Sequence, residues 1–456
     1  MHVYKGVNMF KRKIYDVLVE WRRKSNAKTA LLIEGARRVG KTTIATNLGK
    51  NEFDNYCLID FSKLSDDTLS LFNEIPPDNK LDMFFGNLFL SVSSKVLPKG
   101  SLIIFDEIQF CPKARQAIKH LVADGRYYYI ETGSLVSIKE NTKNILIPSE
   151  ERSIEMLPMD FEEFLWAIND DYSLDAIKRI KDNYDIASEE KFHHQFMKLF
   201  KLYMAIGGMP QAINTYIETN DLLEVHKTKM DIINLYEKDL YKIDNNYKTI
   251  CKIIWDLMPS MLSNHSSRFV VSSLNIESDS VLLKNSIEKL KESKMIYYVP
   301  SCTQPKLGMK LTEQTNSFKL YFNDVGLFTA IVFNDEGVKK ESIYHKLIFS
   351  KLNADLGMVY ENIICQILES KSYNPYYCTW SEIKDDKKKY YEIDFLISKN
   401  ATIVPIEVKK SKNYSTSSLD LFIEKYGIKL GIVLSPKALS KKDKIYYLPL
   451  YMSYLI

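Results

Sequence analysis

The feature that most constrains the fold is a glycine-rich octapeptide near the N-terminus. It is Gly35-Ala-Arg-Arg-Val-Gly40-Lys41-Thr42, and it follows the apolar run ALLIE and opens a stretch of helical pattern. Glycines let backbone N–H groups turn inward around phosphate oxygens, and a helix that begins there adds the partial positive charge of its N-terminus. The motif therefore predicts a strand, a phosphate-binding loop and a helix in that order, as at the start of a mostly parallel α/β domain.

The residues of this loop have separate electrostatic tasks. Lys41 is placed to reach the β- and γ-phosphates of a nucleotide, and the Thr42 hydroxyl is placed to ligate Mg²⁺. ATP and Mg²⁺ are therefore the expected ligands. The predicted nucleotide-binding residues of the loop are Gly35, Ala36, Arg37, Arg38, Val39, Gly40, Lys41, Thr42 and Thr43.

A second apolar run, SLIIFDEIQ, supplies an independent half of such a site. It predicts a buried strand that ends in Asp106 and Glu107. Asp106 would hold Mg²⁺ through water, and Glu107 could orient and deprotonate the attacking water. Two acids at this position can also be a mere helix N-cap, but the phosphate-binding loop earlier in the chain favours the catalytic interpretation.

Two further residues are candidates for the same site. Thr132 ends the strand-like run YYYIET and could sense the γ-phosphate from the strand beside Asp106, although an ordinary turn explains it about equally well. Arg152 could supply a transition-state charge to its own or a neighbouring site. A lone arginine in a charged loop is, however, usually solvated surface.

Length and composition bound the alternatives. The 456 residues exceed the size at which single cores stop growing, so two or three domains are expected. The net charge of +4 comes from 62 basic and 58 acidic side chains, so any attraction to nucleic acid must come from a local patch. The six cysteines form no C-x-x-C pair, which favours a reduced compartment and a cytoplasmic location. No apolar run approaches the roughly 18 residues of a membrane span, so a place in the membrane is not expected.

Changes of pattern along the chain predict an α/β multidomain protein. Residues 1–160 alternate buried strands with helices, as a P-loop NTPase domain with a mostly parallel sheet would. Residues 161–261 are typical of a helical lid or connector, and residues 262–343 of a small helical module compatible with a winged helix. Residues 344–456 return to a mixed α/β pattern and form a second unit.

This second unit carries its own charged residues, in GMVYEN, YEIDFLI and VPIEVKK. The two-residue period of a strand puts Glu407 and Lys409 on one face, and Asp394 could face the same way from the preceding strand. Two carboxylates held together repel each other unless a divalent cation or a proton lies between them. With Glu361, the set predicts metal-assisted phosphodiester hydrolysis. An exposed strand face of alternating Glu and Lys fits the pattern equally well.

The ordered set of motifs resembles a large group of prokaryotic AAA-type ATPases. The motifs are GARRVGKTT, LIIFDEIQ, TGS, LPMDFEEFL, IGGMPQA, KLYFNDVGL, GMVYEN, EIDFLI and IEVKK. Members of this group carry a C-terminal domain of unknown function related to the PD-(D/E)XK nuclease fold, which is restriction-endonuclease-like. The resemblance covers nearly the whole chain, and it implies that residues 1–160 form an AAA-type domain and residues 344–456 a nuclease-like one.

By this resemblance the loop residues Gly35, Gly40, Lys41 and Thr42 match the Walker A positions, and Asp106 and Glu107 match the Walker B positions. Glu361 matches the acidic residue of the first helix of the nuclease-like core. The family usually has Gly-Arg where this chain has Glu151-Arg152. The implied catalytic residues are Glu107, Arg152, Asp394, Glu407 and Lys409, and the implied metal ligands are Thr42, Asp106, Glu361, Asp394 and Glu407.

Two hypotheses follow. In the first, an ATPase controls, through its nucleotide state, a metal-dependent nuclease-like domain that acts on DNA or RNA. In the second, the ATPase is a switch whose C-terminal domain is catalytically inactive and only binds nucleic acid or a protein partner. The hypotheses differ in whether Glu361, Asp394, Glu407 and Lys409 converge on one metal-sized site. A homo-oligomer is compatible with both, because AAA-type ATPases commonly form rings.

Overall fold

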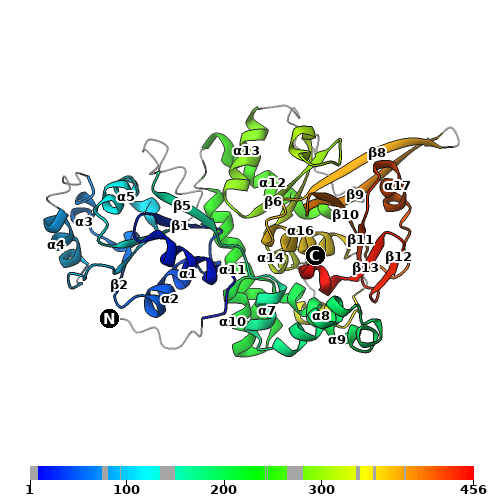
Figure 1. Ribbon diagram of the computed structural model, residues 1–456, viewed down its shortest axis with the longest axis horizontal. Helices are drawn as coiled ribbons and strands as arrows, with labels where there is room; N and C mark the ends of the chain where they lie inside the picture. The colour runs from blue at the N-terminus through cyan, green and yellow to red at the C-terminus, as the bar shows by residue number, and fades with distance from the viewer. Residues whose placement is uncertain are drawn as a thin grey trace. The chain divides into compact units, whose positions relative to one another are not determined.

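The protein was analysed as a computed structural model (Figure 1). It describes residues 9–73, 81–92, 94–133, 149–241, 243, 245–263, 281–334, 339–352, 356–384 and 387–456. The chain divides into two compact units. The N-terminal unit comprises Met1–Leu157, Lys238–Lys248 and Glu292–Lys294, and the C-terminal unit comprises Pro158–Glu237, Thr249–Lys291 and Met295–Ile456. Each unit is described by itself.

The N-terminal unit is built on a five-stranded sheet in which all neighbouring strands run parallel, in the order β2-β3-β4-β1-β5. Its strands are β1 (Ala30–Glu34), β2 (Tyr56–Asp60), β3 (Leu102–Asp106), β4 (Tyr128–Thr132) and β5 (Glu151–Glu155). Its helices include α1 (Ile14–Ser25), α2 (Lys41–Glu52), α3 (Asp66–Ser70), α4 (Leu81–Ser91) and α5 (Pro112–Asp124). The predicted mostly parallel sheet of the first domain is confirmed.

Continuous apolar runs, rather than alternating ones, form the central strands because helices cover a parallel sheet on both faces. All five residues of β3 are buried, which matches the unbroken run in its sequence. An aromatic core lies against the sheet, and its rings meet mostly edge to face, as aromatic quadrupoles prefer. Its members are Phe61, Phe72, Phe84, Phe85, Phe89, Phe105, Tyr127 and Tyr129.

The C-terminal unit begins with the helices that the sequence predicts after residue 160. These are α7 (Phe161–Ala167), α8 (Asp171–Asn183), α9 (Ile186–Ile206), α10 (Pro210–Thr219), α11 (Leu222–Leu240) and α12 (Asn245–Ser263). The last residues of α11 and the first of α12 count with the N-terminal unit. Later helices are α13 (Val281–Glu292), α14 (Val325–Val332), α15 (Lys340–Ile348), α16 (Gly357–Ser370) and α17 (Ser417–Tyr426).

A mixed eight-stranded sheet forms the rest of this unit, in the order β12-β13-β11-β10-β9-β8-β6-β7. The strands are β6 (Ile296–Cys302), β7 (Glu313–Phe322), β8 (Tyr376–Lys384), β9 (Lys387–Lys399), β10 (Thr402–Val408), β11 (Gly431–Ser435), β12 (Ser440–Lys442) and β13 (Ile445–Pro449). Strands β8 to β10 are antiparallel neighbours, whereas β10, β11 and β13 run parallel. The α/β multidomain fold class is thus confirmed: a parallel sheet, a helical region and a mixed sheet.

The described part of residues 262–343 contributes strands as well as helices. Strands β6 and β7 form an antiparallel pair, and β6 meets β8 of the mixed sheet at Ser301 and Tyr377. The apolar run around Ile296 explains why a strand forms here, because aromatic and β-branched residues favour strands. Residues 264–280 lie outside the described part of the chain. The division at residues 161, 262 and 344 stays a prediction.

Several motifs of unassigned role meet in one buried network of the C-terminal unit. The Asp324 carboxylate accepts the backbone N–H of Gly208 and caps α14. The carbonyl of Gly208 accepts the N–H of Met159, whose own carbonyl accepts the Tyr203 hydroxyl, both at 2.7 Å. Gln366 donates to Tyr203. Polar groups that satisfy one another in a low-dielectric interior specify a single packing, so these motifs have a structural role in common.

Candidate functional site

Two glycines shape the loop between β1 and α2. Gly35 has φ of +149°, and a Cβ atom built on it would lie 2.2 Å from the carbonyl oxygen of Met156. Gly40, with φ of +101°, is the residue that precedes the first turn of α2. A side chain is therefore excluded at the first position and strained at the second. The loop that results ends at a helix N-terminus, where free N–H groups attract anions.

Lys41 is a half-buried cation of this loop. Its Nζ donates to the carbonyl oxygens of Gly35 and Ala36, each at 2.9 Å, so the ammonium lies over the loop backbone. Burial lowers the pKa of Lys41 to about 8, against the opposing effect of the Glu107 and Asp106 carboxylates. A half-buried ammonium whose hydrogen bonds go to neutral carbonyls is suited to gain an anionic partner.

Asp106, at the end of β3, is contacted by two of the predicted residues, Thr42 after the loop and Thr132 at the end of β4. The Thr42 hydroxyl donates to Asp106 Oδ1 at 2.8 Å, and the Thr132 hydroxyl donates to the same oxygen. Strands β3 and β4 are parallel neighbours, with Phe105 opposite Glu131, so their carboxyl ends lie together. Hydroxyl and carboxylate oxygens are the ligands that Mg²⁺ prefers. The residues present therefore fit a magnesium ion, and Thr132 lies where the sequence analysis places it.

Glu107 adopts a backbone conformation that few non-glycine residues take. Its φ is +55°, and it ends β3 just before the short helical turn Ile108–Phe110. Gln109 donates a hydrogen bond to the Glu107 carboxylate. A residue in the left-handed conformation at a strand end points its side chain in another direction than the strand residues before it. Backbone strain of this kind concentrates at functional sites. Gln109, which the sequence analysis missed, holds the proposed base.

Two charged residues contact the phosphate-binding loop although no sequence motif predicts that they do. Asp239, buried at the end of α11, forms an ion pair with Arg37 of the loop at 3.0 Å, across 202 residues of chain. Arg12 donates to the carbonyl oxygens of Val39 and Leu157 at 3.0 and 2.6 Å. Neither residue lies in a recognisable motif, since only the tertiary fold brings it to the loop.

Two predicted residues lie at the surface. Thr43 is exposed on the first turn of α2. Arg152 is exposed on the edge strand β5, opposite Leu31 of β1. The preceding residue, Glu151, is instead held by two hydrogen bonds from Arg115, at 3.0 and 2.8 Å. Glu151 thus pairs with helix α5, whereas the Arg152 side chain is exposed.

The C-terminal charged residues lie on neighbouring strands. Strands β9 and β10 pair antiparallel, with Phe395 opposite Ile406, and the Asp394 carboxylate accepts the backbone N–H of Val408 at 2.7 Å. Glu407 is 2% exposed, and its carboxylate lies 2.6 Å from Lys409 Nζ. Burial raises the pKa of Glu407, and Lys409 opposes that rise.

A fully buried lysine of β7, Lys319, was missed by the sequence analysis and changes the meaning of this site. Its ammonium lies 2.8 Å from Glu392, 3.4 Å from Glu361 and 3.9 Å from Asp394. Burial alone would lower the pKa of Lys319, but these carboxylates outweigh it and raise that pKa above its usual value. Burial and the Glu361 charge raise the pKa of Asp394 to about 8.

The four predicted residues therefore do not meet around a metal-sized space. Glu361 and Asp394 converge on the Lys319 ammonium, while Glu407 pairs with Lys409. Across the described ranges, no cluster of three or more His, Cys, Asp or Glu side chains is arranged to hold a metal ion. The donor set here already has an internal cation, so it does not fit a divalent metal as it stands.

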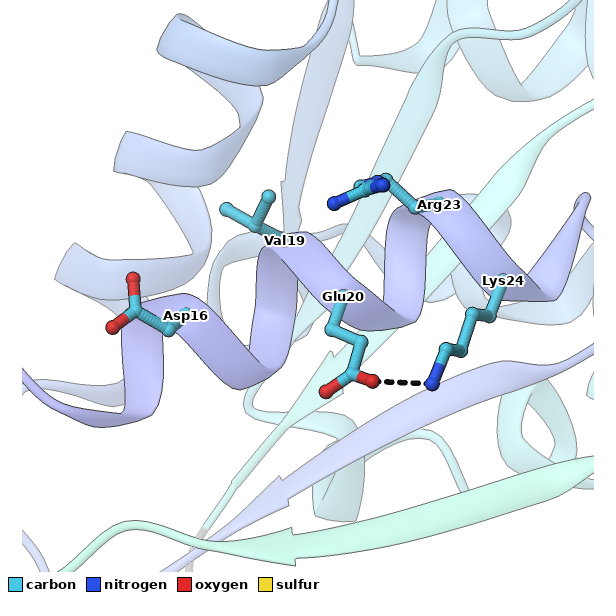
Figure 2. Close-up of a pocket in the computed structure, with 5 residues that line it drawn as sticks. All are labelled: Asp16, Val19, Glu20, Arg23 and Lys24. Carbon is cyan, nitrogen blue, oxygen red and sulfur yellow. Dashed lines mark hydrogen bonds and ion pairs between the residues drawn. The ribbon is translucent and has the colours of Figure 1, made fainter.

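A hollow lies along one face of α1. Figure 2 shows its lining residues, Asp16, Val19, Glu20, Arg23 and Lys24. Glu20 and Lys24 pair with each other, as residues one helical turn apart commonly do. The hollow is formed by a single helix and shares no residue with the phosphate-binding loop. None of the described helices is both long and apolar enough to cross a membrane.

Comparison with protein families places a domain at each end of the chain. A family described as an AAA domain matches residues 27–165. Two domains of unknown function follow, DUF8612 at residues 197–338 and DUF4143 at residues 356–452. No curated protein matches the chain. The N-terminal unit therefore contains an AAA-type ATPase domain. The families that match the later residues have no activity in their descriptions, so they do not support a relation to nucleases.

The chain also has distant similarity to solved structures. C. elegans PCH-2 matches 37% of this chain and 46% of its own at 10% identity and a TM-score of 0.21. Drosophila ORC bound to DNA matches 71% of this chain and 95% of its own at 15% identity and a TM-score of 0.28. The Aeropyrum pernix ORC1 protein in complex with DNA matches 71% and 92% at 10% identity and a TM-score of 0.26. This chain spans less than half the length of PCH-2, and similarity at these scores carries no functional argument.

Proposed function

We propose that the N-terminal unit binds ATP with Mg²⁺ and hydrolyses it. The observation that carries this proposal is the convergence of Thr42 and Thr132 on Asp106, next to a loop with Lys41 half-buried over its backbone. Hydroxyl, carboxylate and ammonium groups with these roles are what phosphoryl transfer to water requires, because catalysis of that step is mostly positioning and charge stabilisation.

Each residue has a definite part in this proposal. Lys41 and the N–H groups at the start of α2 bind the phosphates, and Thr42 and Asp106 hold the Mg²⁺, which neutralises charge on them. Glu107 accepts the proton of the attacking water, with Gln109 holding its carboxylate. Arg152, exposed on an edge strand, is proposed to act on the site of a neighbouring copy in a homo-oligomer.

Two substitutions test the ATPase proposal separately for binding and for chemistry. Lys41→Ala should abolish ATP binding in a titration, because it removes the half-buried ammonium. Glu107→Gln should leave ATP binding intact and reduce phosphate release by at least about 10²-fold, in the range that general-base catalysis supplies. Glu20→Gln on the exposed face of α1 is the matched control and should release phosphate at the wild-type rate. Unchanged ATP affinity in Lys41→Ala, or normal turnover in Glu107→Gln, would contradict the assignment.

For the C-terminal unit, two roles follow from the sequence. A restriction-endonuclease-like domain would cleave DNA or RNA with a divalent metal, and Asp394 beside β10 is the observation in its favour. A binding module would only hold nucleic acid or a protein partner under control of the nucleotide state. We favour the binding module, because Lys319 already compensates Glu361 and Asp394 and a metal would have to displace it.

One experiment separates these roles. Wild-type and Asp394→Ala protein are incubated with DNA and RNA, with Mg²⁺ or Mn²⁺, and with ATP or without nucleotide. The binding-module proposal expects intact nucleic acid in every arm and equal outcomes for both proteins. Metal-dependent cleavage by the wild type that Asp394→Ala abolishes would overturn it and establish the nuclease.

A further inference from the structure

Among the described residues of the C-terminal unit three lysines are buried, and their surroundings differ in an informative way. Lys319 is compensated by three carboxylates. Lys229 donates to the carbonyl of Ala205 and the hydroxyl of Tyr344, and the Asp324 charge acts on it. Lys201, on α9, is the exception. An ammonium removed from water without a countercharge is costly, so a lysine of this kind needs a functional explanation.

Lys201 is only 6% exposed, and its Nζ donates to the neutral hydroxyl of Ser350. Within the part of the chain that the structure describes, no carboxylate forms an ion pair with it. Its electrostatic neighbour is a second cation, Lys412, and burial together with that charge lowers the pKa of Lys201. Ser350 itself is exposed, so the buried ammonium lies next to the surface. Two cations beside an accessible hydroxyl form an arrangement that lacks an anion.

Lys412 lies in the loop that follows β10, beside the loop that follows the parallel strand β11. The loop after β10 is joined to the end of β11 by a hydrogen bond from Lys409 N to the carbonyl of Leu434 at 2.8 Å and by the Tyr414 hydroxyl, 3.2 Å from Ser435 Oγ. Loops at the carboxyl ends of parallel strands are where open α/β sheets bind ligands. The carboxyl ends of β10 and β11, where these two loops begin, therefore offer a place for a ligand.

The loop after β11 carries another lysine, which lies over an aromatic ring of the loop after β10. Lys437 Nζ lies 4.5 Å from the centre of the Tyr414 ring. The carbonyl of Pro436, in the same loop, lies 3.0 Å from Nε2 of His193 on α9, which is also the helix of Lys201. Helix α9 thus contacts the loop after β11 at His193, while Lys412 of the loop after β10 is the cation that acts on Lys201. We name Lys201, Lys412 and Ser350 the lysine site.

We propose that the lysine site binds a phosphate group, and that its natural source is the backbone of a nucleic acid. Phosphate oxygens would satisfy the Lys201 ammonium and the Ser350 hydroxyl together, and Lys412 would neutralise more of the charge. The proposal rests on the partner-binding role of the C-terminal unit and does not depend on ATP hydrolysis.

The test uses the full chain carrying Lys41→Ala, which keeps phosphate off the N-terminal loop. Its thermal unfolding is followed with and without inorganic phosphate, and its binding to fluorescent 20-mers of DNA and RNA is followed by polarisation over a range of salt. The same measurements are made after adding Lys201→Met, and after adding Lys191→Met as the control, because Lys191 is an exposed lysine of the same helix.

The expected result has two parts. Without phosphate, Lys201→Met should unfold at a temperature equal to or higher than its parent, because an uncompensated buried charge is gone. Phosphate should stabilise the parent and the Lys191→Met control but not Lys201→Met. Oligonucleotide affinity should fall about tenfold, and the log–log salt slope should fall by about 0.7 to 0.9, as for one lost phosphate contact.

Other results have definite meanings. Loss of the phosphate effect with unchanged oligonucleotide binding would support the site but assign it to a small phosphate ligand. A parent that does not respond to phosphate, together with a Lys201→Met variant that is destabilised, would make Lys201 a structural residue and overturn the proposal. ATP binding by the chain with native Lys41 is measured separately, so failure of the lysine site is not confused with failure of the ATPase.

Discussion

Replacement of Lys319 by methionine is the sharpest perturbation of the C-terminal unit, because it removes one charge from the centre of three carboxylates. At an effective dielectric constant of about 20, the contacts with Glu392 at 2.8 Å and Glu361 at 3.4 Å each supply roughly 5 to 6 kcal/mol of gross attraction. Asp394, whose pKa is about 8, is only partly ionised at pH 8 and adds less. Desolvation of the buried ions offsets several kcal/mol per ion. Removal of one partner leaves the others uncompensated, so we expect a net loss of about 3 to 5 kcal/mol in the free energy of unfolding at pH 8.

Urea unfolding measures this loss, and metal ions add a second measurement. Lys425→Met is the control, because Lys425 pairs with Glu382 at 3.3 Å at the surface and should cost about 0 to 1 kcal/mol. Without the ammonium, the three carboxylates repel one another, so Mn²⁺ should stabilise Lys319→Met far more than the wild type. The loss should shrink at low pH as the carboxylates take up protons.

Two results would refute this reasoning. If Lys319→Met has the same urea midpoint as the wild type, the ion cluster makes no net contribution to the free energy of unfolding. If Mn²⁺ stabilises the wild type as strongly as the variant, the carboxylates accept a metal with Lys319 in place, and the case against a metal-dependent activity fails.

Three further predictions concern charge at the two sites. The pKa of Lys41 is lowered to about 8, so in the free protein this residue loses its charge as pH rises above that value; the Kd for ATP should rise by up to about tenfold per pH unit there, and a flat titration between pH 8 and 9.5 would contradict it. The pKa of Asp394 is raised from 3.8 to about 8, so the folded state holds an extra proton between these values, and its stability should fall as pH rises from 4 to 8 by at most about 1.4 kcal/mol per unit. Asp394→Asn should remove that component of the slope, measured by urea unfolding at several pH values, and an unchanged slope would assign it elsewhere. Asp239→Asn should tighten ATP binding several-fold, because the carboxylate that pairs with Arg37 competes with the phosphates; weaker binding in calorimetry would show that the ion pair instead shapes the loop.

The parts of the fold that were predictable from sequence are those with local causes. The runs that form β1, β3 and β4 are apolar enough to be predicted as strands from the sequence, and the structure buries most of their residues. The spacing of Gly35 and Gly40 predicts the phosphate-binding loop after β1. The location of β6 and β7 was harder, because strand pairing between residues 296–322 and the later strands depends on contacts far apart in sequence.

The same distinction runs through the candidate sites. Thr42, Asp106 and Thr132 were predicted together because parallel strands bring their carboxyl ends to one edge, a rule that needs no coordinates. The neighbours Asp239 and Gln109 were not, since an ion pair or a side-chain hydrogen bond leaves no spacing pattern to recognise.

The sequence by itself determined that a phosphate-binding loop opens a parallel α/β domain, because that loop works only between a strand and a helix. It also predicted that one buried strand of that domain ends in the acids Asp106 and Glu107. Only the tertiary structure decided the chemistry available to the second set of carboxylates, since Lys319 comes from a strand more than 40 residues before Glu361 and 70 before Asp394 and is fully buried. The reason is physical: charge compensation acts through space, so a lysine distant in sequence can occupy the centre of a cluster for which the sequence left both a metal site and an exposed strand face open.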